Sequence, residues 1–273
     1  MGIFDVFGSR EERERTALRK LQQRLTERFG PSENRQKAAD QLAAMDTPAA
    51  LLALCMRFTV RADVGITDDE EKDAVRRQLV AAGEKAVAPV KEFLERQESG
   101  ISWGLRVLTE LRPAGEVMAT ATALLARVGG EYSRDPEKKL VLLAWLTEHH
   151  APPVPHDAPR PNPLPGRDRG EGDGRDAVQR PEEAAILPLL EDFSDDVRIA
   201  ATRALSRFGA GEAGREALIQ LLLRDRDNAR VRGEVLQALH LLAADVKGHR
   251  PSVEELLVEP WFLDKEGRVK RRG

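Results

Sequence analysis

The sequence predicts an all-α fold in which amphipathic helical hairpins stack into an α-α superhelix. Three observations support this prediction. Aromatic residues make up only 4% of the chain, whereas β-strands favour aromatic and β-branched side chains. Apolar residues recur at spacings of three and four, as on one face of a helix. The pattern also returns several times, and a hairpin with one apolar stripe needs neighbouring copies to bury that stripe.

The clearest copy lies at residues 183–209. Its second helix follows Ser194, Asp195 and Asp196, whose short side chains can accept hydrogen bonds from the free N–H groups at a helix start. The helix carries an apolar stripe that consists of Val197, Ala201, Ala204, Leu205 and Phe208. Gly209 then suits the left-handed backbone that ends many helices. This segment therefore predicts one complete helical hairpin.

Residues 1–30 are predicted to contain a charged cap helix from Ser9 to Phe29. Its apolar side consists of Leu18, Leu21, Leu25 and Phe29. A terminal repeat needs a polar outer surface, which the many arginines and glutamates of this helix provide. Ahead of it, the segment that holds Ile3, Phe4 and Phe7 could fold back on the first hairpin or dock onto a partner or membrane surface. Both possibilities stay open.

Residues 31–150 are predicted to form about four hairpins, and residues 182–250 two more. The expected first helices are Pro48–Phe58, Ala86–Gln97, Glu116–Val128, Glu183–Phe193 and Glu212–Arg224. The expected second helices include Glu33–Leu42, Thr67–Leu79, Ser102–Leu108, Asp135–Leu146 and Val231–Leu239. Each second helix has a leucine at the same place in the pattern, namely Leu42, Leu79, Leu108, Leu146, Leu205 and Leu239. These leucines are the predicted core.

Two segments break the pattern. Residues 151–181 are rich in proline, glycine and charge, a composition typical of a flexible linker or insertion, with a docking segment in a polyproline conformation as the alternative. Residues 251–273 predict a short helix from Val253, a small β-hairpin with Trp261 and Val269 in its strands, and a basic tail. That tail holds Arg268, Lys270, Arg271 and Arg272, and we interpret it as a solvated terminus.

The copies that begin at Asp195 and Val231 resemble HEAT repeats, especially the short variety of the bilin lyases. The resemblance covers residues 33 to about 245, apart from the linker. It implies an α-solenoid in which second helices line the inner face of a curved stack. It also implies that an arginine after the valine, here Arg198, braces neighbouring turns by pairing with loop aspartates. Lys72 and Lys139 replace that arginine in two copies.

The sequence predicts no catalytic residue, cofactor or metal. Cys55 is the one cysteine, and its apolar neighbours favour a buried, unreactive thiol. His149, His150 and His156 suggest a metal site, but a proline-rich segment offers no rigid second shell to hold the ligands. His240 is expected to be a surface or half-buried ring. Phosphate-binding loops and serine nucleophile motifs are absent from the sequence.

Two enzyme classes share the architecture that the resemblance implies. HEAT-containing hydroxylases bind iron through His-Glu pairs on successive repeats, and the sequence has no such pairs. HEAT-like alkylpurine DNA glycosylases use a basic groove with Trp and Asp. Here Trp103 and Trp145 are expected to fill core. The net charge is −3 and the pI is about 6.1, which makes nucleic acid an unlikely partner because phosphate neutralisation supplies most of such affinity.

We therefore predict a non-catalytic protein-interaction scaffold. Each second helix has one residue that is expected to be exposed on the inner face. In chain order these residues are Asp40, Arg77, Arg106, Ala144, Arg203 and Gln237. Arginines among apolar residues are frequent anchors of protein interfaces, so Arg77, Arg106 and Arg203 are the predicted partner contacts. A DNA-binding or glycosylase function is the alternative, followed by a bilin-lyase-like chromophore function. No apolar run approaches ~18 residues, and one cysteine fits a reducing compartment, so we expect a cytoplasmic protein.

Overall fold

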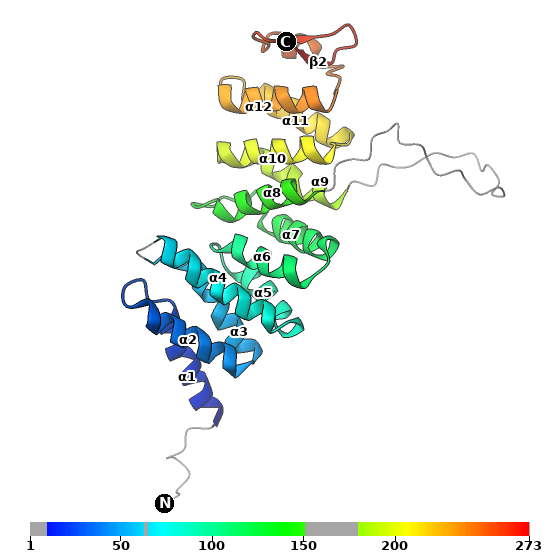
Figure 1. Cartoon of the computed structure of the whole chain (residues 1–273). Coiled ribbons are helices and arrows are strands. Elements are labelled where there is room, and N and C mark those ends of the chain that lie inside the picture. The colour runs from blue at the N-terminus through cyan, green and yellow to red at the C-terminus, as the bar shows by residue number, and fades with distance from the viewer. Residues whose placement is uncertain (1–9, 63–64, 151–179, 273) are drawn as a thin grey trace, which may run out of the picture. The chain divides into compact units, whose positions relative to one another are not determined.

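The structure is a computed structural model that describes residues 10–62, 65–150 and 180–272. The expectations for Ile3, Phe4 and Phe7 and for the proline-rich segment through residue 179 lie outside this part of the chain. In the described residues nearly all regular structure is helical, with one two-stranded sheet at the C-terminal end. The all-α prediction is confirmed, as Figure 1 shows.

The chain divides into two units, of which the first ends at Leu124 and the second begins at Leu125. Unit 1 contains α1 (Arg10–Leu25), α2 (Ser32–Met45), α3 (Pro48–Cys55), the 3-10 helix η2 (Met56–Thr59), α4 (Gly65–Ala81), α5 (Glu84–Arg96) and α6 (Ile101–Leu111). The boundary falls inside α7 (Ala114–Val128). Within unit 1, α3 packs on α5, whereas α4 packs on α2 and α6. First helices thus contact first helices, and second helices contact second helices.

Unit 2 repeats this arrangement. Its elements are α8 (Glu137–His149), α9 (Pro181–Ile186), the 3-10 helix η3 (Leu187–Glu191), α10 (Asp195–Phe208), α11 (Glu212–Arg224), α12 (Ala229–Leu241), α13 (Arg250–Glu254), β1 (Trp261–Leu263) and β2 (Val269–Arg271). Helix α10 packs between α8 and α12, so these three second helices form one layer (Figure 1). The helices η3 and α11 cover the other side of α10 and α12. Each unit is therefore a stack of helical hairpins, as in an α-solenoid.

The leucine pattern marks the core correctly. All six leucines of the second helices are at most 1% exposed. Cys55 is fully buried, its thiol donates to the carbonyl oxygen of Leu51 at 3.3 Å, and burial raises the pKa of this thiol. The prediction of a buried, unreactive cysteine agrees with this environment, since only the thiolate is a strong nucleophile.

Several element ends differ from the prediction. Helix α1 ends at Leu25, so Phe29 lies beyond it and is 72% exposed instead of completing the apolar stripe. Helix α8 begins at Glu137, because the Asp135 carboxylate accepts the Glu137 backbone N–H at 3.1 Å and sets the start there. Ser194 is the N-cap residue of α10, but its side chain accepts no cap hydrogen bond.

The C-terminal hairpin is confirmed. Strands β1 and β2 pair antiparallel, with Trp261 opposite Arg271 and Leu263 opposite Val269. Gly267 takes a positive φ of 78° in the turn between them, a conformation that costs glycine little. The ring of His240 on α12 contacts both the Val269 carbonyl oxygen, at 3.1 Å, and the Trp261 ring. The hairpin therefore covers the end of the last repeat, as a capping element should.

Candidate functional site on the second helices

The three predicted contact arginines all lie on second helices and are all exposed. Arg77 belongs to α4 and Arg106 to α6, both in unit 1, whereas Arg203 belongs to α10 in unit 2. The first two share a neighbourhood within their unit. Arg203 belongs to the other unit and has its own surroundings there.

In unit 1, the Asp73 carboxylate contacts Arg77 and its neighbour Arg76. It accepts from Arg76 at 2.8 Å and lies 3.3 Å from Arg77. The hydrogen bond from Arg76 lowers the pKa of Asp73, burial opposes this effect, and the charges of Arg76, Arg77 and Arg106 add to the lowering. The Arg106 guanidinium also lies over the Trp103 ring, 4.9 Å from its centroid. This surface therefore carries cationic side chains that are only partly neutralised.

Trp103 itself only partly follows the core prediction. Its ring is half-buried and stacks on Phe58 with the centroids 5.8 Å apart, so its other face lies under Arg106. Trp145 does belong to the core and stacks on His149. The half-buried Trp103 and the exposed Arg106 together form a stacked pair at the surface, in which the ring attracts the cation electrostatically.

In unit 2, Arg203 borders a groove of about 510 Å³ on the layer of second helices. The groove is lined by Leu140 and Ala144 from α8, Asp196, Ile199, Ala200 and Arg203 from α10, and Arg230 and Glu234 from α12. Its apolar residues come from α8 and α10, and its charged residues from α10 and α12. The predicted inner-face residues Ala144 and Arg203 are thus brought together in one depression.

Two ion pairs join α10 to α12 along this groove. Arg203 donates to Glu234 at 2.7 Å, and Arg230 to Asp196 at 2.6 Å. The hydrogen bond to Glu234 raises the pKa of Arg203, so this side chain stays charged. Exposed pairs of this kind contribute only about 0–1 kcal/mol to stability. They can therefore exchange their partners for those of a bound protein at small cost.

The remaining groove residues were missed by the sequence analysis, although a signal was present. Asp196, Ile199 and Ala200 precede Arg203 by seven, four and three residues, which are the spacings of one helical face. A search outward from Arg203 along α10 would have found them. Arg230 and Glu234 needed the packing of α12 on α10, which only the structure supplies.

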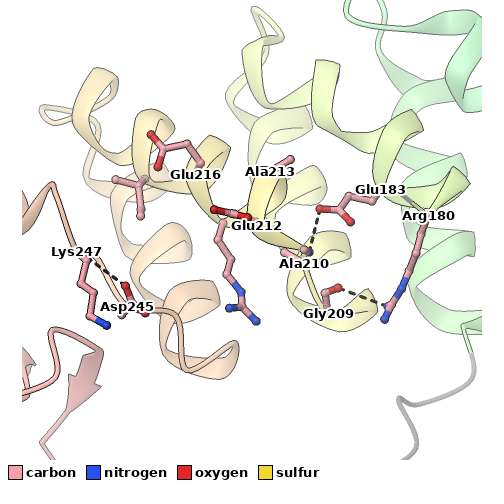
Figure 2. Close-up of a pocket in the computed structure, with 12 residues that line it drawn as sticks. Arg180, Glu183, Gly209, Ala210, Glu212, Ala213, Glu216, Asp245 and Lys247 are labelled. Carbon is pink, nitrogen blue, oxygen red and sulfur yellow. Dashed lines mark hydrogen bonds between the residues drawn. The ribbon is translucent and has the colours of Figure 1, made fainter. Parts of the chain in front are cut away.

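A larger hollow, about 1090 Å³, lies on another part of unit 2 (Figure 2). Its deepest acid is Glu183, which is buried and accepts the backbone N–H groups of Gly211 and Gly214 at 2.9 and 3.0 Å. Figure 2 shows Arg180 beside it, where it donates to the backbone oxygens of Phe208 and Gly209. Because Glu183 already caps α11 and Arg180 holds the end of α10, these side chains serve the fold.

The brace implied by the HEAT resemblance is present in unit 2. Arg198 donates to the Asp192 backbone oxygen at 2.6 Å and lies 2.8 Å from the Asp225 carboxylate of the next turn. Lys139 occupies the corresponding place in the preceding repeat, where it donates to the Glu131 backbone oxygen and to the Asp192 carboxylate. The lysine therefore makes the same kind of connection as the arginine that it replaces.

The histidines at the end of α8 face aromatic rings. His149 stacks on Trp145 at 4.2 Å, and the His150 ring lies 4.1 Å from that of Phe208. Burial lowers the pKa of His150. His156 lies outside the described residues. In the part of the chain that the structure describes, no group of three or more His, Cys, Asp or Glu side chains converges as a metal-ligand set.

The fold defines the class of protein as an α-solenoid of stacked helical hairpins. Residues 183–269 match the family of HEAT repeats, which supports the HEAT resemblance of the C-terminal repeats. A search of curated proteins found no match. Among solved structures, the chain is similar to human deoxyhypusine hydroxylase in complex with glycerol, with 20% identity over 90% of each chain and a TM-score of 0.29. Of the helices described, none is both long and apolar enough to cross a bilayer.

Proposed function

We propose that this protein is a non-catalytic interaction scaffold whose second helices bind protein partners. The observation that carries the proposal is the groove on α8, α10 and α12, which is lined by both apolar residues and exposed arginines. Protein interfaces favour this combination, since an apolar centre supplies affinity and arginine supplies both charge and contact area. Arg77 and Arg106 would provide a second contact region on unit 1.

The pairing of the charges supports a protein partner over DNA. Arg203 and Arg230 each face a carboxylate at hydrogen-bond distance, so the groove holds equal numbers of positive and negative side chains. A phosphate backbone needs unopposed cations. A peptide surface with charges of both signs can satisfy both members of each pair. Retention on DNA at low salt would contradict this choice, because non-specific DNA binding should be strongest there.

The test is a quantitative pull-down with the triple variant Arg77→Ala, Arg106→Ala and Arg203→Ala. The matched control replaces Arg24, Arg96 and Arg215 by alanine, since these arginines are exposed on the cap helix α1 and on the first helices α5 and α11. We expect the wild type and the control to bind the same partner with equal affinity. The triple variant should bind that partner at least about tenfold more weakly, a loss of ~1.4 kcal/mol in binding free energy. Circular dichroism should show that all three proteins are folded. If the triple variant keeps every partner at unchanged affinity, the proposal is wrong.

A further inference from the structure

Two aromatic side chains of unit 2 lie in solvent on adjacent turns. Tyr132 belongs to the turn between α7 and α8, and Phe193 to the turn between η3 and α10. They are 71% and 78% exposed, yet their rings touch edge to face, with centroids 5.6 Å apart and planes at 86°. An exposed aromatic cluster is a common sign of an interaction surface. We call these two side chains the aromatic pair.

The turns that carry the aromatic pair are fastened to each other. Lys139, near the start of α8, forms an ion pair of 2.6 Å with Asp192 of the second turn, and both side chains are almost completely buried. The Lys139 ammonium also donates to the backbone oxygen of Glu131, next to Tyr132. A Cβ atom added to Gly130 would lie 2.8 Å from the Pro188 backbone oxygen of η3, so the turn that carries Tyr132 packs closely against η3, which leads into the turn that carries Phe193.

Arg198 fixes the second turn from its other side. Its guanidinium donates to the backbone oxygens of Asp192 and Phe193, at 2.6 and 3.3 Å. The backbone next to both rings is therefore held by charged hydrogen bonds, of which the Lys139–Asp192 pair is buried, while the rings themselves are exposed. A rigid platform loses little entropy when it binds, which favours affinity from a small contact area. The aromatic pair is thus preorganised for a ligand.

Acidic side chains border the aromatic pair. Glu131 directly precedes Tyr132 and is exposed, and Glu191 lies two residues before Phe193 with its side chain 80% exposed. The Arg224 guanidinium lies 3.9 Å from the Glu191 carboxylate, which is too long for a strong hydrogen bond. Two perpendicular exposed rings with exposed acidic residues next to them in the chain suit a ligand that combines flat apolar rings with positive charge.

We propose that the aromatic pair binds a proline-rich segment of a protein partner that carries arginine. Proline rings pack on aromatic side chains, and a polyproline helix is extended before it binds, so its ordering cost is low. An arginine in the segment would pair with Glu131 or Glu191. This surface lies on turns rather than on the groove of the second helices, and the proposal is independent of the function proposed above.

The protein provides a convenient probe and a convenient reporter. Residues 151–168 have the required composition of alternating prolines with Arg160 and Arg167, so a synthetic peptide of that sequence serves as the ligand. Tyr132 is the one tyrosine of the whole chain. Incorporation of 3-fluorotyrosine into the full-length protein therefore gives a single ¹⁹F resonance that reports directly on the aromatic pair.

We expect the ¹⁹F resonance to shift saturably when the peptide is added, and the affinity to fall as salt is raised, because exposed charges are screened. Phe193→Ala should weaken binding at least about tenfold, which is ~1.4 kcal/mol. The double variant Glu131→Gln and Glu191→Gln should weaken binding and remove its salt dependence. Phe29→Ala is the matched control, since Phe29 is equally exposed on a different turn, and it should bind as the wild type does.

Two results would overturn the proposal. One is equal binding of a control peptide in which alanine replaces every proline, since that ligand is not a polyproline helix. The other is a ¹⁹F resonance that does not shift when peptide is added to millimolar concentration. This result must hold both for the wild type and for a full-length variant in which serine replaces each proline of residues 152–165. That variant removes the chain's own segment as a competitor. The ¹⁹F resonance of this variant, without added peptide, could also differ from that of the wild type at every protein concentration. That result would support binding of a proline-rich segment to the aromatic pair, with the chain's own segment as the ligand.

Discussion

At the scale of single residues, the main finding is a cluster of buried charges in unit 1. Arg57 is completely buried and donates to Asp68 at 2.6 Å and to Glu71 at 2.9 Å. Arg35 completes the cluster with a bidentate contact to Glu71, at 2.7 and 2.8 Å. Lys72 reaches Asp68 at 2.7 Å. The carboxylates are thus surrounded by cations, which ties α2 and η2 to α4.

This cluster should make unit 1 sensitive to acid. Burial alone would favour the neutral forms, but hydrogen bonds from Arg35 and Arg57 outweigh it and lower the pKa of Glu71, and those from Lys72, Ala62 and Arg57 do the same for Asp68. A carboxyl whose folded-state pKa is depressed adds stability above its ordinary pKa, about 4. That contribution is lost as the pH falls through the folded-state value.

We therefore expect the free energy of unfolding of unit 1 to fall steadily as the pH drops below about 5. Glu71→Gln should lower this free energy at pH 7 and make its pH dependence shallower, because one titrating carboxylate has been removed. Urea unfolding, followed by circular dichroism at a series of pH values, measures both effects. Glu33→Gln, at an exposed position of α2, is the control. If the free energy of unfolding depends on pH in the same way in the wild type and in Glu71→Gln, then Glu71 does not contribute to the acid sensitivity.

At the scale of the element, glycines of two second helices differ in how closely neighbouring side chains pack against them. Gly104 in α6 touches the first-helix layer, since a Cβ atom there would lie 2.7 Å from Leu94 Cδ2 and 3.3 Å from Phe93 Cδ1. Gly233 in α12 is different. A Cβ atom there would meet no heavy atom of the described residues within 4 Å. The same residue type is therefore required by packing in one helix and not in the other.

The two glycines predict opposite results for the same substitution. Gly104→Ala should destabilise by about 1–3 kcal/mol, because both neighbouring side chains are fully buried and cannot move aside without strain. Gly233→Ala should stabilise by about 0.5–1 kcal/mol, since alanine is the better helix former. Urea denaturation of the two variants tests this directly. Equal effects of both substitutions would mean that helix propensity, and not packing, dominates at Gly104.

At the scale of the whole molecule, stability should be divided among repeats. In a solenoid each repeat contacts mainly its neighbours, so stability is approximately a sum of repeat and interface contributions. The contacts of α10 with α8 and α12, and of α4 with α2 and α6, follow this neighbour rule within the described units. Damage to one unit should therefore leave distant repeats largely protected.

Arg57→Met tests this division. Removal of the buried cation leaves Asp68 and Glu71 with fewer partners, which should cost about 3–5 kcal/mol. Hydrogen exchange should then accelerate roughly 100-fold or more for slowly exchanging amides of α4, at about 1.4 kcal/mol per factor of ten. Amides of α12 should change little. Arg96→Ala, which alters an exposed arginine, should leave both rates as they are. A common acceleration of α4 and α12 would indicate a single cooperative unit instead.

The sequence alone determined the all-α class, the positions of the second helices and the buried leucines. These features depend on local periodicity, which helix geometry converts directly into one buried face. It also located Arg77, Arg106 and Arg203 on exposed positions of second helices, because exposure follows from the same periodicity. The small C-terminal hairpin was predictable from Trp261, Val269 and the turn residues between them.

Only the tertiary structure decided which side chains meet. Arg57 reaches Glu71 and Arg203 reaches Glu234 across packed helices, and no local pattern encodes the distance between residues of different helices. Tyr132 and Phe193 lie together where Lys139 of α8 links the Glu131 backbone oxygen of one turn to the Asp192 carboxylate of another. Charged and aromatic side chains act through such long-range contacts, whereas a helix is selected by residues three and four apart.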